Sequence, residues 1–170
     1  DETKLLEYAA SIENSDGIVN VLSYHHPRGI NSIFNFRIDI DEKNNSQYVA
    51  YLSQGGLGLP NKGYYFDEDE RSITIRADYK QHISNVFDWN GLSLSEEEVA
   101  RMYGIEEALA EASRSQEENR DDNAKYNPYT VKEIANENPT INWHKYFDKI
   151  GLKNKSKIIV QQPEYFKRLG

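Results

Sequence analysis

The chain has 170 residues, of which 38% are hydrophobic and 28% charged, a composition typical of a folded globular protein and not of a disordered segment. Its 20 basic and 28 acidic residues give a net charge of −8, which repels a phosphate backbone, so we expect no nucleic-acid partner. The absence of cysteine excludes disulfides and thiolate zinc ligands.

The first predicted element is a helix from residue 3 to about residue 23, interrupted at residues 14–17. Apolar residues recur at helical spacing on both sides of the interruption, and Asp16 is the predicted N-cap of the second part. Pro27 and Gly29 end the helix.

The clearest local pattern follows, and it predicts a β-hairpin over about residues 34–53. Apolar and polar residues alternate along the first strand, which places the apolar set in the core and the polar set in water: Phe34, Phe36, Ile38 and Ile40 against Asn35, Arg37, Asp39 and Asp41. Two strands alone are marginally stable, so we expect helices to cover the apolar face.

Helices dominate the rest of the chain. Two long ones are predicted at about 68–89 and 95–118, the second opened by a capping box of Ser95 and Glu98. Shorter elements follow: a helix capped by Thr130 with Glu133, a helix over 143–150, a strand over 158–160 and a helical turn from Pro163. The predicted fold is mainly α with a small β-hairpin, and residues 1–170 form a single domain or a fragment of one.

The residues predict no reaction centre. None of the four histidines has a second histidine three to five residues further on, and no His-Glu-x-x-His occurs, so no metal ligand is predicted. The glycines at 55–58 lack the spacing of a phosphate-binding loop, and there is no Gly-x-Ser-x-Gly. Clusters of carboxylates are interpreted as solvated helix ends and faces. No catalytic residue is therefore predicted.

Four collinear segments carry a resemblance to a known family. The segment from Leu52 to Phe66 contains Gln-Gly-Gly-Leu-Gly-Leu-Pro followed by Tyr-Tyr, and Glu-Asn-Arg-Asp begins at Glu118. Weaker matches are Ile141-Asn-Trp with Tyr-Phe, and Val160-Gln-Gln-Pro-Glu-Tyr-Phe. Together they resemble the N-terminal lobe of the family of zinc endopeptidases that comprises neprilysin, endothelin-converting enzyme and bacterial oligopeptidase O. The chain departs from the family pattern at Lys62-Gly63 and at Asp122, which affects local loop shape.

The resemblance implies a protein of two mainly helical lobes around a cavity. In such a family the zinc lies in the C-terminal lobe, so we expect no cofactor in this chain and zinc in the absent catalytic domain. The chain would be the non-catalytic, cavity-capping lobe of a zinc metalloendopeptidase, inactive alone, with the catalytic lobe and peptide substrates as partners. An alternative is a stand-alone module that binds peptides or proteins without catalysis. The parent is expected outside the cytoplasm (secreted, periplasmic or membrane-anchored), or in the cytoplasm as in some bacterial members.

The resemblance also singles out residues, all with structural roles. Gly56, Gly58 and Pro60 would shape the turn that leaves the hairpin, and Tyr64 and Tyr65 would pack beneath it. Asn119, Arg120 and Asp121 would tie a loop to the body by charge-assisted hydrogen bonds. The full set is Gln54, Gly56, Leu57, Gly58, Leu59, Pro60, Tyr64, Tyr65, Asn119, Arg120, Asp121, Tyr126, Asn127, Trp143 and Pro163.

Overall fold

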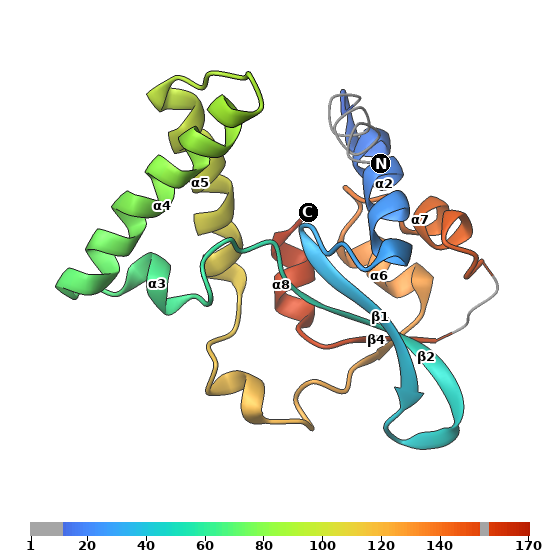
Figure 1. Ribbon diagram of the computed structural model, residues 1–170. Coiled ribbons are helices and arrows are strands. Elements are labelled where there is room, and N and C mark those ends of the chain that lie inside the picture. The colour runs from blue at the N-terminus through green and yellow to red at the C-terminus, as the bar shows by residue number, and fades with distance from the viewer. Residues whose placement is uncertain (1–11, 154–156) are drawn as a thin grey trace. The chain divides into compact units, whose positions relative to one another are not determined.

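The computed structural model describes residues 12–153 and 157–170, which form a mainly helical fold with one small four-stranded sheet, as the sequence predicts (Figure 1). The chain divides into two compact units. The first comprises the residues up to Gly56 together with Asp121–Gly170, and the second comprises Leu57–Arg120. The assignment of residues 1–170 to a single domain or a fragment of one stays a prediction.

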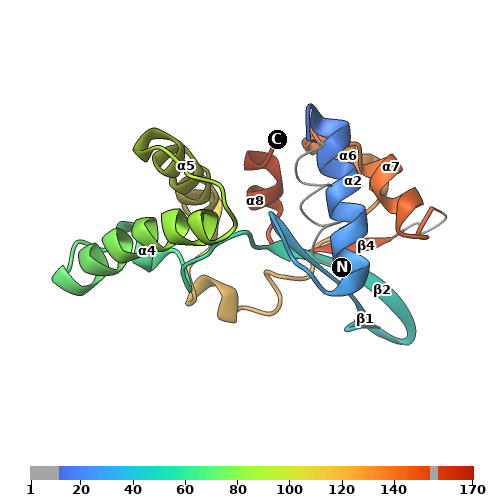
Figure 2. The same ribbon diagram turned by 45° about the horizontal axis from the view of Figure 1, so that its top comes forward.

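The first unit holds the sheet and most of the short elements. Its helices are α2 (Ser15–His25), the 3₁₀ helix η1 (His26–Arg28), α6 (Val131–Glu137), α7 (Trp143–Lys149) and α8 (Pro163–Arg168). Its strands are β1 (Phe34–Asp41), β2 (Asn44–Gln54), β3 (Pro128–Tyr129) and β4 (Ile158–Val160). Helices α2, α6 and α7 lie side by side on one side of the sheet in both views (Figures 1 and 2).

The sheet extends the hairpin with strands from the end of the chain. Strands β1 and β2 are antiparallel, with Phe34 opposite Gln54, and β4 then pairs parallel to β2 with Ala50 opposite Ile158. The two-residue β3 completes the order β1-β2-β4-β3. The β2–β4 pairing therefore joins segments more than 100 residues apart in the sequence.

Aromatic rings fill the space between the sheet and its helices. The ring of Phe34 lies 5.5 Å from that of Trp143, 5.8 Å from that of Tyr146 and 5.6 Å from that of Phe166, measured between centroids. All four side chains are buried. Large apolar rings in such edge and tilted arrangements contribute most of the stabilisation of a small core.

The alternation along β1 predicts the strand but assigns the wrong burial to its far end. Ile38 and Ile40 are 53% and 45% exposed, whereas Asp41 is completely buried. The aromatic side chains of the helices contact Phe34 and Phe36 of β1, and the strand continues beyond the part that the helices cover. The register shifts between Ile40 and Asp41, and such an irregularity redirects the side chain that follows it.

The helix caps predicted from the sequence at Ser95 and Thr130 are observed, and the one predicted for α2 is wrong. Asn14, not Asp16, caps α2, because its Oδ1 accepts from the backbone N–H groups of Asp16 and Gly17. The capping boxes of Ser95 with Glu98 and of Thr130 with Glu133 are confirmed. The part of the first predicted helix that falls on residues 3–11 lies outside the described residues.

The second unit is a helical hairpin with a short entry turn. It contains α3 (Gly63–Phe66), α4 (Glu70–Trp89), α5 (Glu96–Ala112) and the 3₁₀ helix η2 (Glu118–Arg120). Four of its buried residues form a cluster, against which Leu57, Tyr64, Ile75 and Tyr79 pack: Leu59, Tyr65, Tyr103 and Ala110. Helix α5 ends at Ala112, short of residue 118, because Ser113 turns to extended backbone while its hydroxyl donates to the Leu109 carbonyl.

None of the helices in residues 12–153 and 157–170 combines the length and the apolar character that crossing a membrane requires.

Candidate functional site

The Gly-Leu-Gly-Leu-Pro motif is held by a single carboxylate from α5. Glu106 Oε2 accepts from the Tyr65 hydroxyl (2.7 Å) and from the backbone N–H of Gly58 (3.0 Å). Its Oε1 accepts from the Tyr79 hydroxyl (2.7 Å). We call Gly58, Tyr65, Tyr79 and Glu106 the Glu106 cluster. It ties the motif to α3, α4 and α5 at once.

Two features of the chain allow this close approach. A side chain at Gly58 would place its Cβ 1.8 Å from the Tyr79 hydroxyl oxygen, so any other residue would force Tyr79 to move. Gly56 has φ +73°, a left-handed conformation that favours glycine. Beyond the turn, the Leu59 N–H donates to the Tyr65 hydroxyl oxygen (3.1 Å), so Tyr65 lies against the motif.

The two tyrosine hydroxyls of the cluster are neutral donors to the Glu106 carboxylate. Burial, then the hydrogen bond to Glu106, raise the pKa of both Tyr65 and Tyr79, so both hydroxyls stay protonated at neutral pH. A protonated phenol donating to a carboxylate is a positioning contact. The arrangement holds the motif in place and presents no activated nucleophile.

The Glu-Asn-Arg-Asp segment makes local hydrogen bonds. Asn119 Nδ2 donates to the carbonyls of Arg114 (3.3 Å) and Ser115 (3.0 Å), and Asp121 Oδ1 accepts from the backbone N–H groups of Asn123 and Ala124. The tie to the body through Arg120 stays a prediction. Both motifs lie where the chain passes from one unit to the other, at Gly56–Leu57 and at Arg120–Asp121.

The other motif residues each have a place in one unit. Gln54 ends β2, Leu57 and Tyr64 pack on the buried cluster of the second unit, Leu59 is buried and Pro60 is exposed. In the first unit, Asn127 Nδ2 donates to the carbonyls of Ala124 (2.9 Å) and Val160 (3.1 Å), and Trp143 Nε1 donates to that of Asn138 (3.0 Å). Pro163 is the first residue of α8.

Asp41 anchors the far end of the hairpin. Its carboxylate forms an ion pair with Lys157 and accepts from the Tyr126 hydroxyl (2.7 Å), the Lys43 N–H (3.0 Å) and Gln47 Nε2 (3.1 Å). The bond from Lys157 is the main reason why the pKa of Asp41 lies well below its usual range. Sequence reasoning missed this site, because a carboxylate in an alternating strand is normally solvated.

His26 is a second buried polar group that the sequence did not reveal. Its Nε2 lies 3.1 Å from the Phe34 carbonyl and its Nδ1 lies 2.6 Å from the Tyr146 hydroxyl. A carbonyl can only accept, so Nε2 carries the hydrogen and Nδ1 accepts from Tyr146. Burial lowers the pKa of His26 to about 4, which leaves the ring neutral at pH 7. Its role is structural, joining η1 to β1 and α7.

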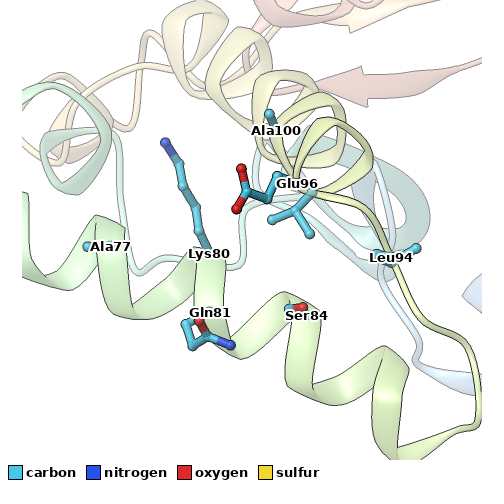
Figure 3. A pocket seen from close by; sticks show the side chains of 8 residues that line it. Ala77, Lys80, Gln81, Ser84, Leu94, Glu96 and Ala100 are labelled. Atoms are coloured by element: carbon cyan, nitrogen blue, oxygen red, sulfur yellow. The ribbon is translucent and has the colours of Figure 1, made fainter.

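One hollow between α4 and the start of α5 has a volume of about 270 Å³ (Figure 3). Its lining is mostly small or apolar, with Lys80 extending from α4 and Glu96 from α5: Ala77, Lys80, Gln81, Ser84, Leu94, Glu96, Val99 and Ala100. The lining holds no histidine that could act as a base for the hydroxyl of Ser84. We assign no chemistry to it.

The described residues contain no candidate metal site. Within residues 12–153 and 157–170, no three or more His, Cys, Asp or Glu side chains gather in a way that could hold a metal ion. The described part of the chain therefore offers zinc no ligand set.

Solved structures share the fold of this chain. The fold matches the Mycobacterium tuberculosis zinc metalloprotease Zmp1 with a TM-score of 0.86 at 22% identity, over 98% of this chain and 26% of that one. It also matches PepO of Lactobacillus rhamnosis with a TM-score of 0.71 at 14% identity, over 98% of this chain and 27% of that one. The fold is thus one found within zinc metalloproteases.

Sequence comparison gives the family. The model of peptidase family M13, for the family's N-terminal part, matches residues 2–170, and the chain belongs to that family. Neprilysin-3 of Drosophila melanogaster is 27% identical over 155 residues, which are 86% of this chain and 20% of that protein. Human endothelin-converting enzyme-like 1 is 28% identical over 121 residues, 70% of this chain and 16% of that protein. The chain thus spans about a fifth of the length of these relatives.

Proposed function

We propose that this chain is the non-catalytic, cavity-capping lobe of a zinc-dependent endopeptidase that cleaves peptides in a closed chamber. The observation that carries the proposal is the match of the M13 model to residues 2–170 of a chain that spans only 20% of Neprilysin-3. The partner would be the catalytic lobe of the same polypeptide, and the substrates would be peptides.

Zinc belongs, in this proposal, to the part of the parent outside these residues. The described residues offer it no ligand set, and zinc bound elsewhere in the parent would supply the Lewis acid for peptide hydrolysis. We further propose that the parent acts outside the cytoplasm, in keeping with the endothelin-converting enzymes among its relatives.

The contribution of this chain is a fixed shape. The Glu106 cluster holds the turn that follows β2, and Asp41 with Lys157 holds the end of the hairpin. Fixed contacts of this kind suit a lobe that encloses the chamber, because the lobe must exclude folded proteins while admitting flexible peptides.

The proposal is tested by assaying the full-length protein against two substrates, a short unstructured peptide and a folded protein that carries the same sequence in a surface loop. We expect zinc-dependent cleavage of the peptide, and cleavage of the folded protein only after it is unfolded. Equal cleavage of the folded protein would overturn the capping role. Zinc-free turnover by residues 1–170 would overturn the non-catalytic role, and peptide binding by a native protein that lacks a zinc site would favour a stand-alone binding module.

A further inference from the structure

A second groove between α4 and α5 is lined mainly by apolar side chains. It has a volume of about 360 Å³ and is lined by Gly58, Tyr79, His82, Ile83, Val86, Phe87, Met102 and Glu106. All of these residues belong to the second unit. We call it the Met102 groove. The two helices that form it lie beside each other in both views (Figures 1 and 2).

The groove leaves the helical hairpin without a complete core. Of the 20 residues of α4, only Ser72 and Ile83 are buried. Val86, Phe87 and Met102 are only half-buried where they line the groove. Apolar surface left in water costs roughly 25 cal/mol per Å², and a continuous patch of it marks an interaction surface.

The length of the relatives points to what covers the groove. The chain accounts for 26% of the Zmp1 chain and 20% of Neprilysin-3, so a comparable parent would have most of its polypeptide outside these residues. We propose that an apolar segment of the same polypeptide, from outside residues 1–170, lies in the Met102 groove. This inference rests on the proposed function, because it requires that longer parent.

Two other occupants fit the observations less well. A substrate peptide would leave the apolar face of α4 exposed whenever no substrate was bound. A second copy of this chain would bring together two molecules that each carry a net charge of −8, which disfavours association. A permanent segment of the parent buries the groove without either cost.

Met102 provides the test, because it is the single methionine among these 170 residues. Hydrogen peroxide transfers one oxygen atom to an accessible thioether and is itself reduced to water. The full-length protein carrying Ala108→Met is treated with peroxide, and oxidation is followed by mass spectrometry of the tryptic peptide over residues 102–114. The added methionine, at an exposed position of α5, is the internal reference.

We expect Met102 to be oxidised at least about ten-fold more slowly than the reference in the folded protein, and at the same rate after unfolding in urea. Comparable rates in the folded protein would overturn the inference. Protection that appears only with added peptide, or only at high protein concentration, would also overturn it, in favour of substrate or a second copy.

A second experiment compares Met102→Lys with Ala108→Lys in the full-length protein. Only the first substitution should lower the melting temperature.

The two proposals fail in different ways. A native protein close to 19.7 kDa would contradict the proposed function itself. Rapid oxidation of Met102 in a native protein several times heavier would contradict this inference alone.

Discussion

At the scale of single residues, three polar groups of the described chain are satisfied by being neutral or paired. His26 is neutral with both ring nitrogens engaged, Asp41 is ionised beside Lys157, and Glu106 is surrounded by donors from two tyrosines and one backbone N–H. Buried polar groups are costly unless they are satisfied in this way. Each of these residues therefore makes a prediction about stability.

His26 makes stability depend on pH. Its pKa is about 4 in the folded chain against 6.5 for an ordinary histidine, so between these values the unfolded chain binds more protons. Its stabilising contribution is complete above pH 6.5 and is lost as the pH falls toward 4. Between pH 7 and pH 5 we expect the free energy of unfolding to fall by roughly 2 kcal/mol, measured by urea denaturation.

A variant with His26→Gln should lose most of this dependence, while His144→Gln, at an exposed position, should keep it. The carboxylates whose pKa is lowered, such as Asp41 and Glu98, lose their contribution below their ordinary pKa values of 3.8 and 4.5, which lie below the interval from pH 7 to pH 5. An unchanged slope between pH 7 and pH 5 in His26→Gln would contradict the assignment.

Gly58 and Gly104 predict opposite effects of the same substitution. Alanine at residue 58 collides with the Tyr79 hydroxyl and breaks its bond to Glu106, so we expect Gly58→Ala to destabilise the chain by about 1–3 kcal/mol. Gly104 lies inside α5 with open space around it, so Gly104→Ala should stabilise by about 1 kcal/mol. The stability of both variants is measured by urea denaturation. A Gly58→Ala protein as stable as the unsubstituted protein would be inconsistent with the Glu106 cluster.

At the scale of elements, local patterns predict elements well and their partners poorly. Alternation predicts the strand over 34–41, and the spacing of Ser95 and Glu98 predicts the start of α5. The parallel pairing of β2 with β4 depends on contacts over more than 100 residues, which no local pattern encodes. The same holds for the candidate site, since the motif residue Gly58 meets its partner Glu106 48 residues further on.

The hairpin supplies a prediction at this scale. Asp41→Asn keeps the shape of the side chain but removes the charge that faces Lys157, so the far end of the hairpin should open more often. We expect faster hydrogen exchange of the backbone amides over residues 44–51 and a lower melting temperature. Asp39→Asn is the matched control, because Asp39 is exposed and lies 3.5 Å from Arg37. Equal exchange in the two variants would show that Asp41 does not hold the hairpin.

At the scale of the whole molecule, membership of the M13 family and the incomplete core of the second unit lead to the same expectation. The M13 family model matches nearly all of the chain, whereas the chain covers only a fifth of Neprilysin-3. Helix α4 buries few of its residues. The resemblance carried by four collinear segments, beginning with Leu52–Phe66, predicts the family, and the M13 match confirms it. The groove between α4 and α5 could not be predicted, because helical spacing marks an apolar face without showing whether it is covered.

The intact mass of the native protein, isolated from its source with antibodies against this chain, distinguishes a lobe of a larger peptidase from a stand-alone protein. We expect a species several times heavier than 19.7 kDa whose peptidase activity is lost on chelation of zinc and restored by adding it back. A native species of about 19.7 kDa with no co-purifying catalytic chain would contradict this expectation.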